Sequence, residues 1–157
     1  MRLRRLAAFL PLALLASSVA VTGCRADEDL EPGLEPGAEG IKAVIQTYAK
    51  AVADGDGPRA CSLMSRTAQE ALIQRTGVAG SCLTAVEAIA EPLSEDAKTA
   101  LADLEVTDIN GAETTAASAT ATVDAPGADE AASALGGTVF TLSVADARWG
   151  IDSVRPG

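Results

Sequence analysis

The sequence predicts an α+β domain in which helices come first and antiparallel strands follow, behind an N-terminal targeting segment. Three observations lead to this prediction. An uncharged apolar run lies near the start of the 157-residue chain. Helical patterns then recur between residues 41 and 103, and the pattern changes to the alternation typical of strands after residue 104. A chain of this length has room for one such domain.

The first 23 residues are expected to be a cleaved signal peptide. Arg2, Arg4 and Arg5 precede an uncharged run of 16 residues, Leu6 to Val21. This run is short for a membrane span, which needs about 20 apolar residues. It ends in Val21-Thr22-Gly23-Cys24, which resembles the lipobox of bacterial lipoproteins. The alternatives are an ordinary secreted protein with an incidental cysteine and a transmembrane anchor.

The lipobox resemblance implies that Cys24 receives a diacylglyceryl group and becomes the first residue of the mature chain. The protein would then be anchored to the cell membrane on its extracytoplasmic face, because two acyl chains are enough for stable anchoring. Residues 24 to 40 are expected to form a flexible acidic linker, in which Leu30-Glu-Pro-Gly is repeated as Leu34-Glu-Pro-Gly. The globular domain is expected to occupy residues 41 to 157.

Composition excludes several functions. The formal net charge is -10, which argues against nucleic acid as a partner, because binding to phosphates depends on clustered Lys and Arg. The chain has no His, so His-based triads and HExxH zinc sites are excluded. The segment Asp54-Gly55-Asp56-Gly57 resembles part of a calcium loop, but Val52 and Leu63 would occupy its first and last ligand positions. The sequence therefore predicts no metal site, no cofactor and no catalytic set.

Cys61 and Cys82 are expected to form a disulfide bond, because the chain is routed to an oxidising compartment and Cys24 is assigned to lipid. The closed loop would stabilise the domain by about 3 kcal/mol in the chain-entropy model. Free thiols and a redox site are the alternatives, although the chain has no CxxC motif.

The helices are predicted from apolar spacing and from capping residues. The first, residues 41 to 53, places Ile41, Val44, Ile45, Tyr48 and Val52 on one face. Pro58 suits the first turn of a second helix, and Thr67 to Glu70 reads as a capping box that opens a third helix ending near Gly77. Ser81 caps a helix over 82 to 91, and Ser94 precedes a helix that runs to about Asp103.

The strands are predicted from alternation and turn residues. The first two span residues 104 to 109 and 114 to 123, with Asn110-Gly111 as a turn signal. Residues 124 to 137 form a connection that includes a helical turn around 130 to 135. A closing hairpin follows, with strands at 139 to 144 and 148 to 154 around a turn at Asp146-Ala147.

Taken together, these segments resemble small extracytoplasmic members of the nuclear transport factor 2-like superfamily, which are often lipoproteins of high-GC Gram-positive (actinobacterial) bacteria. The resemblance is carried by four features over residues 41 to 154: the first helix followed by Asp54-Gly-Asp56, the segment Ala60-Cys61-x-Leu63-Met64-Ser65, a second Cys after a helix, and Arg148-Trp149-x-Ile151 in the closing hairpin. It implies a cone-like fold in which helices cover a curved antiparallel sheet and often leave a pocket. Relatives include isomerases, cyclases and non-enzymatic binding modules, so fold alone does not decide function.

Three functions are expected, in order of preference. The first is a membrane-tethered, non-catalytic module that binds a partner protein in the cell envelope. The second is a carrier or sensor of a small apolar ligand, with Tyr48, Met64, Phe140 and Trp149 as wall residues of the pocket. Tyr48 and Trp149 also have simpler interpretations, as a core aromatic and as a packing anchor of the hairpin. The third is an enzyme of the isomerase or cyclase type, which needs a carboxylate in an apolar pocket.

Overall fold

The computed structural model describes residues 31–113, 117–124 and 129–157. Within these ranges the chain forms an α+β domain with a four-stranded antiparallel sheet, as predicted. The helices and strands are, in chain order, α1 (Gly37–Asp54), α2 (Gly57–Ser62), α3 (Arg66–Thr76), α4 (Cys82–Ala90), α5 (Glu95–Ala102), β1 (Glu105–Asn110), β2 (Ser118–Asp124), α6 (Asp129–Leu135), β3 (Val139–Ala145) and β4 (Arg148–Arg155).

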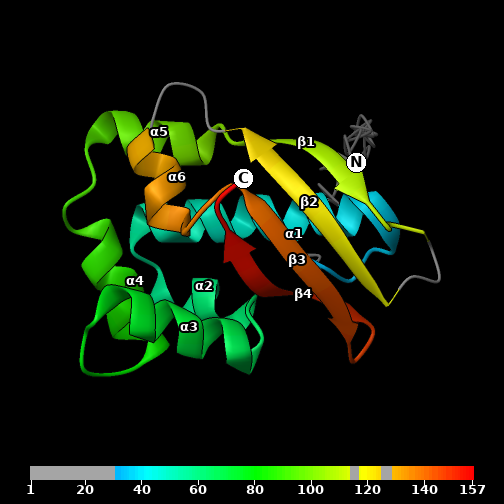
Figure 1. The fold of residues 1–157 in the computed structure, drawn as a ribbon, viewed down its shortest axis with the longest axis horizontal. Coiled ribbons are helices and arrows are strands. Elements are labelled where there is room, and N and C mark those ends of the chain that lie inside the picture. The colour runs from blue at the N-terminus through cyan, green and yellow to red at the C-terminus, as the bar shows by residue number, and fades with distance from the viewer. Residues whose placement is uncertain (1–30, 114–116, 125–128) are drawn as a thin grey trace, which may run out of the picture.

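The four strands pair in sequence order, β1-β2-β3-β4, and every neighbouring pair is antiparallel. Figure 1 shows α1 running across one face of this sheet, with α2, α3 and α4 grouped beyond one end of the strands and with α5 and α6 above that group. The helical group and the sheet meet at β4, where the N–H of Ile151 donates to the carbonyl of Leu63 at 2.8 Å. The region where α1, α3, α6 and β4 converge is the region of the candidate site.

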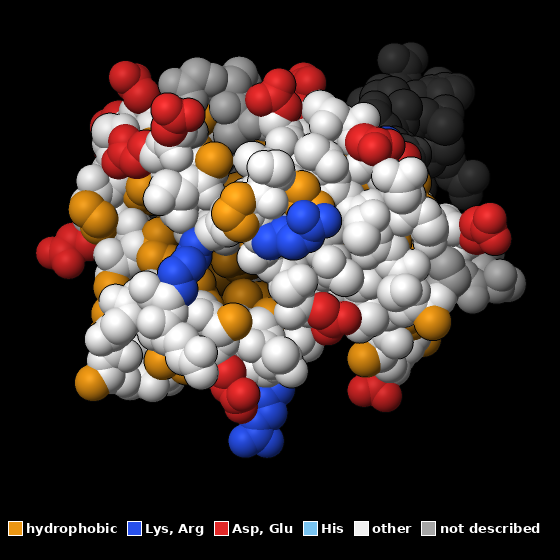
Figure 2. Space-filling model, in the orientation of Figure 1, with side chains coloured by type: hydrophobic (Ala, Val, Ile, Leu, Met, Phe, Trp, Pro, Cys, Tyr) orange, Lys and Arg blue, Asp and Glu red, His pale blue; other side chains and the backbone are white. Residues whose placement is uncertain are grey.

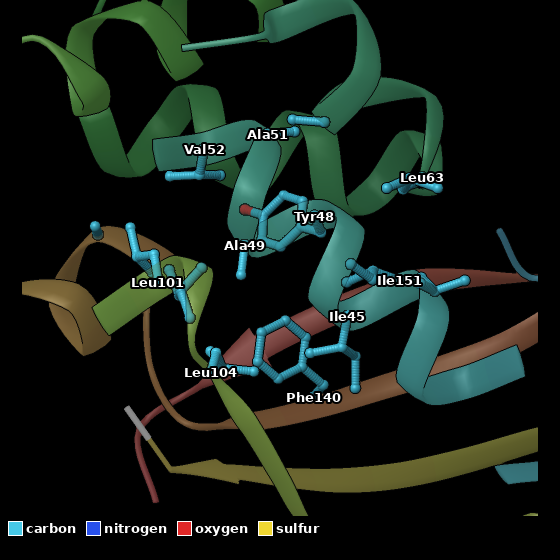
Figure 3. Packing of buried hydrophobic residues seen from close by; sticks show 14 of the residues in the cluster. Ile45, Tyr48, Ala49, Ala51, Val52, Leu63, Leu101, Leu104, Phe140 and Ile151 are labelled. Carbon is cyan, nitrogen blue, oxygen red and sulfur yellow. The ribbon is translucent and has the colours of Figure 1, made fainter. Parts of the chain in front are cut away.

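The apolar face of α1 forms the centre of the core. Ile41, Val44, Ile45, Tyr48 and Val52 are all 0 % exposed, as the helical spacing of the sequence predicts. The rings of Tyr48 and Phe140 meet edge to face, with centroids 6.2 Å apart, an arrangement that aromatic pairs prefer. Figure 3 shows Phe140 beside the Tyr48 ring rather than at its hydroxyl oxygen.

The domain begins earlier in the chain than the sequence predicts. The helix α1 starts at Gly37 instead of residue 41, and Pro32 and Gly33 are buried although the sequence predicts a flexible linker there. The carbonyl of Gly33 accepts a hydrogen bond of 2.9 Å from the N–H of Trp149, and Glu31 forms an ion pair with Arg148. The packed domain therefore begins before residue 41, because β4 supplies Glu31 and Gly33 with partners far away in the sequence.

The start of α3 also differs from the prediction. The N-cap is Ser65, whose side chain accepts a hydrogen bond of 3.3 Å from the N–H of Ala68, and Thr67 lies inside the helix. The side chain of Gln69 donates to the carbonyls of Cys61 and Met64, at 2.9 and 3.2 Å. These bonds tie the first turn of α3 to α2, so the helix begins before Thr67. Gly77 ends the helix in the left-handed conformation, as expected.

The closing hairpin has the predicted two-residue turn. Asp146 and Ala147 have φ angles of 51° and 60°, and Ala145 pairs with Arg148 on either side of them. Positive φ at both central positions is typical of the type I′ turn that suits the twist of a hairpin. Neither residue is glycine, so both adopt a conformation that is unfavourable for most side chains.

Cys61 and Cys82 form a disulfide bond, which joins α2 to the first turn of α4. Cys24 and the predicted signal peptide lie outside the described residues. Over the ranges given above, no helix combines the length and the apolar character that crossing a membrane requires.

Candidate functional site

A cavity of about 160 Å³ lies where α1, α3, α6 and β4 converge. Most of its wall is apolar, and three side chains bring polar groups to it: Tyr48 from α1, Arg75 from the last turn of α3 and Ser153 from β4. The complete lining is Tyr48, Met64, Ala68, Ala71, Leu72, Arg75, Leu135, Gly136, Ser153 and Val154. In Figure 2 a hollow with a hydrophobic floor opens in this region, and basic side chains lie along its upper edge.

Tyr48 belongs to the lining of this cavity and carries a buried hydroxyl group. Its side chain is 0 % exposed, and its oxygen has no hydrogen-bond partner among the described residues. Burial raises the pKa of Tyr48 to about 12, while the positive charge of Arg75 acts in the opposite direction. The hydroxyl is therefore neutral at physiological pH and keeps its proton to donate. An unpaired buried hydroxyl is costly, because it has lost its hydrogen bonds to water.

Arg75 stands at the mouth of the cavity, with part of its side chain exposed. Its two terminal nitrogens donate to the last turn of α6: Nη1 to the carbonyl of Ser133 at 3.1 Å and Nη2 to the carbonyl of Ala134 at 2.9 Å. A cation at this end of a helix interacts favourably with the helix dipole. Burial lowers the pKa of Arg75, and the nearby Tyr48 acts against that shift. The side chain nevertheless stays charged, because the ordinary pKa of arginine is so high.

Two glycines let the chain pass close to Arg75. Gly136 has a φ of 92°, and a Cβ atom at this position would overlap the guanidinium group of Arg75. Gly137 follows with a φ of 140° and lies against the backbone of Arg155. Only glycine combines these backbone angles with such close contacts. Gly136 thus forms part of the wall of the cavity on the side of α6.

A second cavity, of about 420 Å³, lies next to the first. Arg75 and Gly136 belong to the walls of both. The remaining lining residues come from α6 and the chain after it, and from the C-terminal residues: Ala132, Ser133, Gly137, Thr138, Pro156 and Gly157. The guanidinium group of Arg75 therefore lies at the boundary between a small apolar cavity and a larger, more open one.

The structure brings together two of the four residues that were expected to line a ligand pocket. Tyr48 and Met64 line the cavity. Phe140 is 0 % exposed and packs against the Tyr48 ring. Trp149 lies against the first turn of α1, since a Cβ atom on Gly40 would come within 2.9 Å of its Cδ1 atom. Neither of these last two residues lines the cavity.

Arg75, Leu135 and the glycine pair are not predicted from the sequence. The available signals were a basic residue in the last turn of a predicted helix and two consecutive glycines after a helical turn. Neither signal indicates that the two segments meet. In the part of the chain that is described, no group of three or more His, Cys, Asp or Glu side chains is placed to hold a metal ion.

Comparison with known proteins gives no relative from which a function could be transferred. No protein-family model, no curated protein and no solved structure matches the chain. The function must therefore be argued from the cavity itself and from the signals at the N-terminus.

Proposed function

We propose that this protein is a lipid-anchored extracytoplasmic lipoprotein whose domain binds a small, mostly apolar molecule without transforming it. The anchor is Cys24, after cleavage of residues 1 to 23. The basic start, the apolar run and Val21-Thr22-Gly23-Cys24 support this part of the proposal. The protein would then hold its ligand at the outer face of the cell membrane, as a carrier or a sensor.

The observation that carries the binding function is the cavity beside Tyr48. Ligand sites in proteins are concave and mostly apolar, with a few polar groups that fix the orientation of the ligand. The cavity has this composition, and the hydroxyl of Tyr48 is fully buried without a hydrogen-bond partner among the residues that the structure describes. An apolar cavity of about 150 Å³ holds a benzene molecule, so a ligand body the size of one six-membered ring suits a cavity of about 160 Å³.

This observation favours the ligand carrier over the two other functions considered. A module for an envelope protein needs a docking surface, and no specific feature of the described surface supports one. An isomerase or cyclase needs a carboxylate in the pocket, and the described lining residues include no Asp or Glu. The geometry therefore gives specific support to the carrier or sensor.

We further propose that the fold is the cone of the nuclear transport factor 2-like superfamily. The order of the elements supports this proposal, because helices precede a sheet that is covered on one face by α1. A cavity between the helices and the last strand also agrees with it.

Native mass spectrometry of the mature protein, extracted gently from its own membrane, tests the proposed function. The expected native spectrum shows an additional small mass that denaturation releases. The expected denatured mass shows an acylated Cys24. A native mass equal to the denatured mass would contradict ligand binding and favour the envelope interaction module. An unmodified Cys24 would contradict the lipid anchor.

A further inference from the structure

We infer that the molecule bound in the cavity is a small organic acid, with an apolar body in the cavity and its carboxylate between Tyr48 and Arg75. This inference rests on the proposed function and specifies the chemical class of the ligand. It depends on two residues with polar groups, one from α1 and one from α3, that line the same cavity. Each of them retains hydrogen-bonding capacity that the described protein groups do not use.

The first group is the Tyr48 hydroxyl, which supplies one donor. It is fully buried and has no partner among the described residues, so a ligand oxygen in the cavity would satisfy it. Hydrogen bonds from a hydroxyl to a carboxylate are shorter and stronger than those between neutral groups. A purely apolar ligand would fill the space but would leave this hydroxyl unpaired.

The second group is the guanidinium of Arg75, which supplies the charge. Arginine has five N–H donors, and the described structure uses Nη1 and Nη2 once each, toward Ser133 and Ala134. No carboxylate forms an ion pair with Arg75 in residues 31–113, 117–124 and 129–157, although five other ion pairs occur there. The two bonds to α6 hold the guanidinium at the mouth of the cavity, where its remaining donors are available to an anion.

The surroundings favour an acid with a small body. The rest of the wall is formed by side chains such as Met64, Leu72 and Leu135, which exclude water from an apolar group. Arg75 lies at the boundary with the larger cavity. The carboxylate of the ligand would therefore face the more open side, while the apolar body of the ligand is buried. The acidic surface of the protein, with its net charge of -10, opposes the approach of anions at long range, but physiological salt screens that repulsion beyond about 8 Å.

Fluorine NMR of the full mature protein with two ligands of equal ring size tests this inference. The probes are 4-fluorobenzoate, which carries the carboxylate, and 4-fluorotoluene, which does not. We expect 4-fluorobenzoate to bind at least about tenfold more tightly. Tyr48→Phe should weaken its binding about tenfold and leave 4-fluorotoluene unaffected. Arg75→Gln should also weaken the binding of 4-fluorobenzoate.

The controls separate the two groups from general effects on the fold. Arg66→Gln removes an equal charge from the same helix at an exposed position paired with Glu70 and should leave both affinities unchanged. Arg75→Gln also removes two bonds to α6, whereas Tyr48→Phe removes no hydrogen bond to a described residue. Tyr48→Phe therefore remains a valid test even where Arg75→Gln loosens α6.

The outcomes separate this inference from the proposed function. Equal affinity of the two probes for the wild-type protein would overturn the inference that the ligand carries a carboxylate. The proposed function as a carrier of an apolar ligand would then remain. If neither Tyr48→Phe nor Arg75→Gln weakens the binding of 4-fluorobenzoate, the inference that the carboxylate lies between these two residues is overturned. Failure of both probes to bind would overturn the small-ligand function as well.

Discussion

Tyr48 combines a ring that packs in the core with a hydroxyl that the described protein groups leave unpaired. The ring belongs to the buried apolar face of α1. The proposed ligand site depends on the hydroxyl, because it is an unpaired donor on a residue that lines an apolar cavity. A phenylalanine would pack equally well against Phe140 and would supply no donor.

The ionisation of Tyr48 is directly testable, because it is the only tyrosine in the chain. We expect it to titrate at a pKa of about 12 in the folded protein, whereas an unfolded chain has a tyrosine pKa of about 10. Stability should therefore be unaffected by this group below about pH 10 and should fall as pH rises from there toward 12. Tyrosinate absorbance measures the ionisation of Tyr48, and circular dichroism recorded on the same samples measures whether the protein is still folded. Tyrosinate formation near pH 10 in a protein that is still folded would show that the hydroxyl is not buried.

The backbone conformation of Ala147 leads to a prediction about stability. Its φ of 60° costs a residue with a Cβ atom about 1 kcal/mol relative to glycine. Ala147→Gly should therefore stabilise the domain by up to about 1 kcal/mol, measured by urea unfolding. Ala145→Gly, in the adjacent strand, is the control and should destabilise it. Destabilisation by Ala147→Gly would mean that the turn does not adopt this conformation.

At the scale of elements, α6 is held at both ends by residues far away in the sequence. Arg75 binds its C-terminal carbonyls. At its N-terminal end, Glu130 accepts hydrogen bonds from the backbone N–H of Ser94 at 3.1 Å and from its hydroxyl at 2.7 Å. Ser94 in turn caps α5 through the N–H of Ala97. A helix of seven residues has little stability of its own, so these contacts position the wall that α6 gives to the cavity.

The contact between Glu130 and Ser94 predicts a dependence of stability on acid pH. The hydrogen bonds from the hydroxyl and the N–H of Ser94 lower the pKa of Glu130. A carboxylate with a lowered pKa contributes stability above its unfolded pKa, and this contribution is lost as pH falls through the folded value. Glu130→Gln should therefore lower stability near neutral pH and reduce the loss of stability between about pH 5 and about pH 3. Urea unfolding across that range measures the difference.

Glu87→Gln, at an exposed position of α4, is the matched control and should leave the pH profile of stability unchanged. An identical profile for Glu130→Gln and the wild-type protein would show that the contact with Ser94 does not form in solution.

At the scale of the molecule, the disulfide bond holds together a domain whose aromatic content is only 3 %. It joins α2 to α4, on either side of the α3 helix that supplies Arg75 to the cavity. Its closed loop is worth about 3 kcal/mol in the chain-entropy model, a substantial share of the 5 to 15 kcal/mol typical of a small domain, by order of magnitude.

Replacing both cysteines, Cys61→Ala with Cys82→Ala, should lower the free energy of unfolding by about 3 kcal/mol. Urea unfolding measures this change, and reduction of the wild-type protein should produce a similar one. Cys24→Ser is the control, because Cys24 is assigned to lipid and not to the disulfide. Unchanged stability in the double variant would contradict a disulfide in the folded protein.

Much of this architecture could be predicted from local patterns in the sequence. The buried stripe of α1, the caps at Ser81 and Ser94 and the closing hairpin depend on spacing or residue type. The pairing of Cys61 with Cys82 follows from the expected oxidising compartment and from the assignment of Cys24 to lipid. The cavity could not be predicted in this way. Arg75 meets Ser133 and Ala134 across 58 and 59 residues, and the N-terminal segment meets Arg148 across 117. Such contacts come from tertiary packing, for which a local pattern carries no signal.

The central claim, that Tyr48 lies on a ligand cavity, is tested most directly by carbon NMR of protein labelled at the ring carbon that carries its hydroxyl. A single tyrosine gives a single resonance. We predict that saturation with 4-fluorobenzoate moves this resonance, because the hydroxyl gains a carboxylate acceptor, and that the exposed Arg66→Gln variant behaves identically. A tyrosine resonance that stays in place while the probe is bound would show that the ligand lies elsewhere and would contradict the claim.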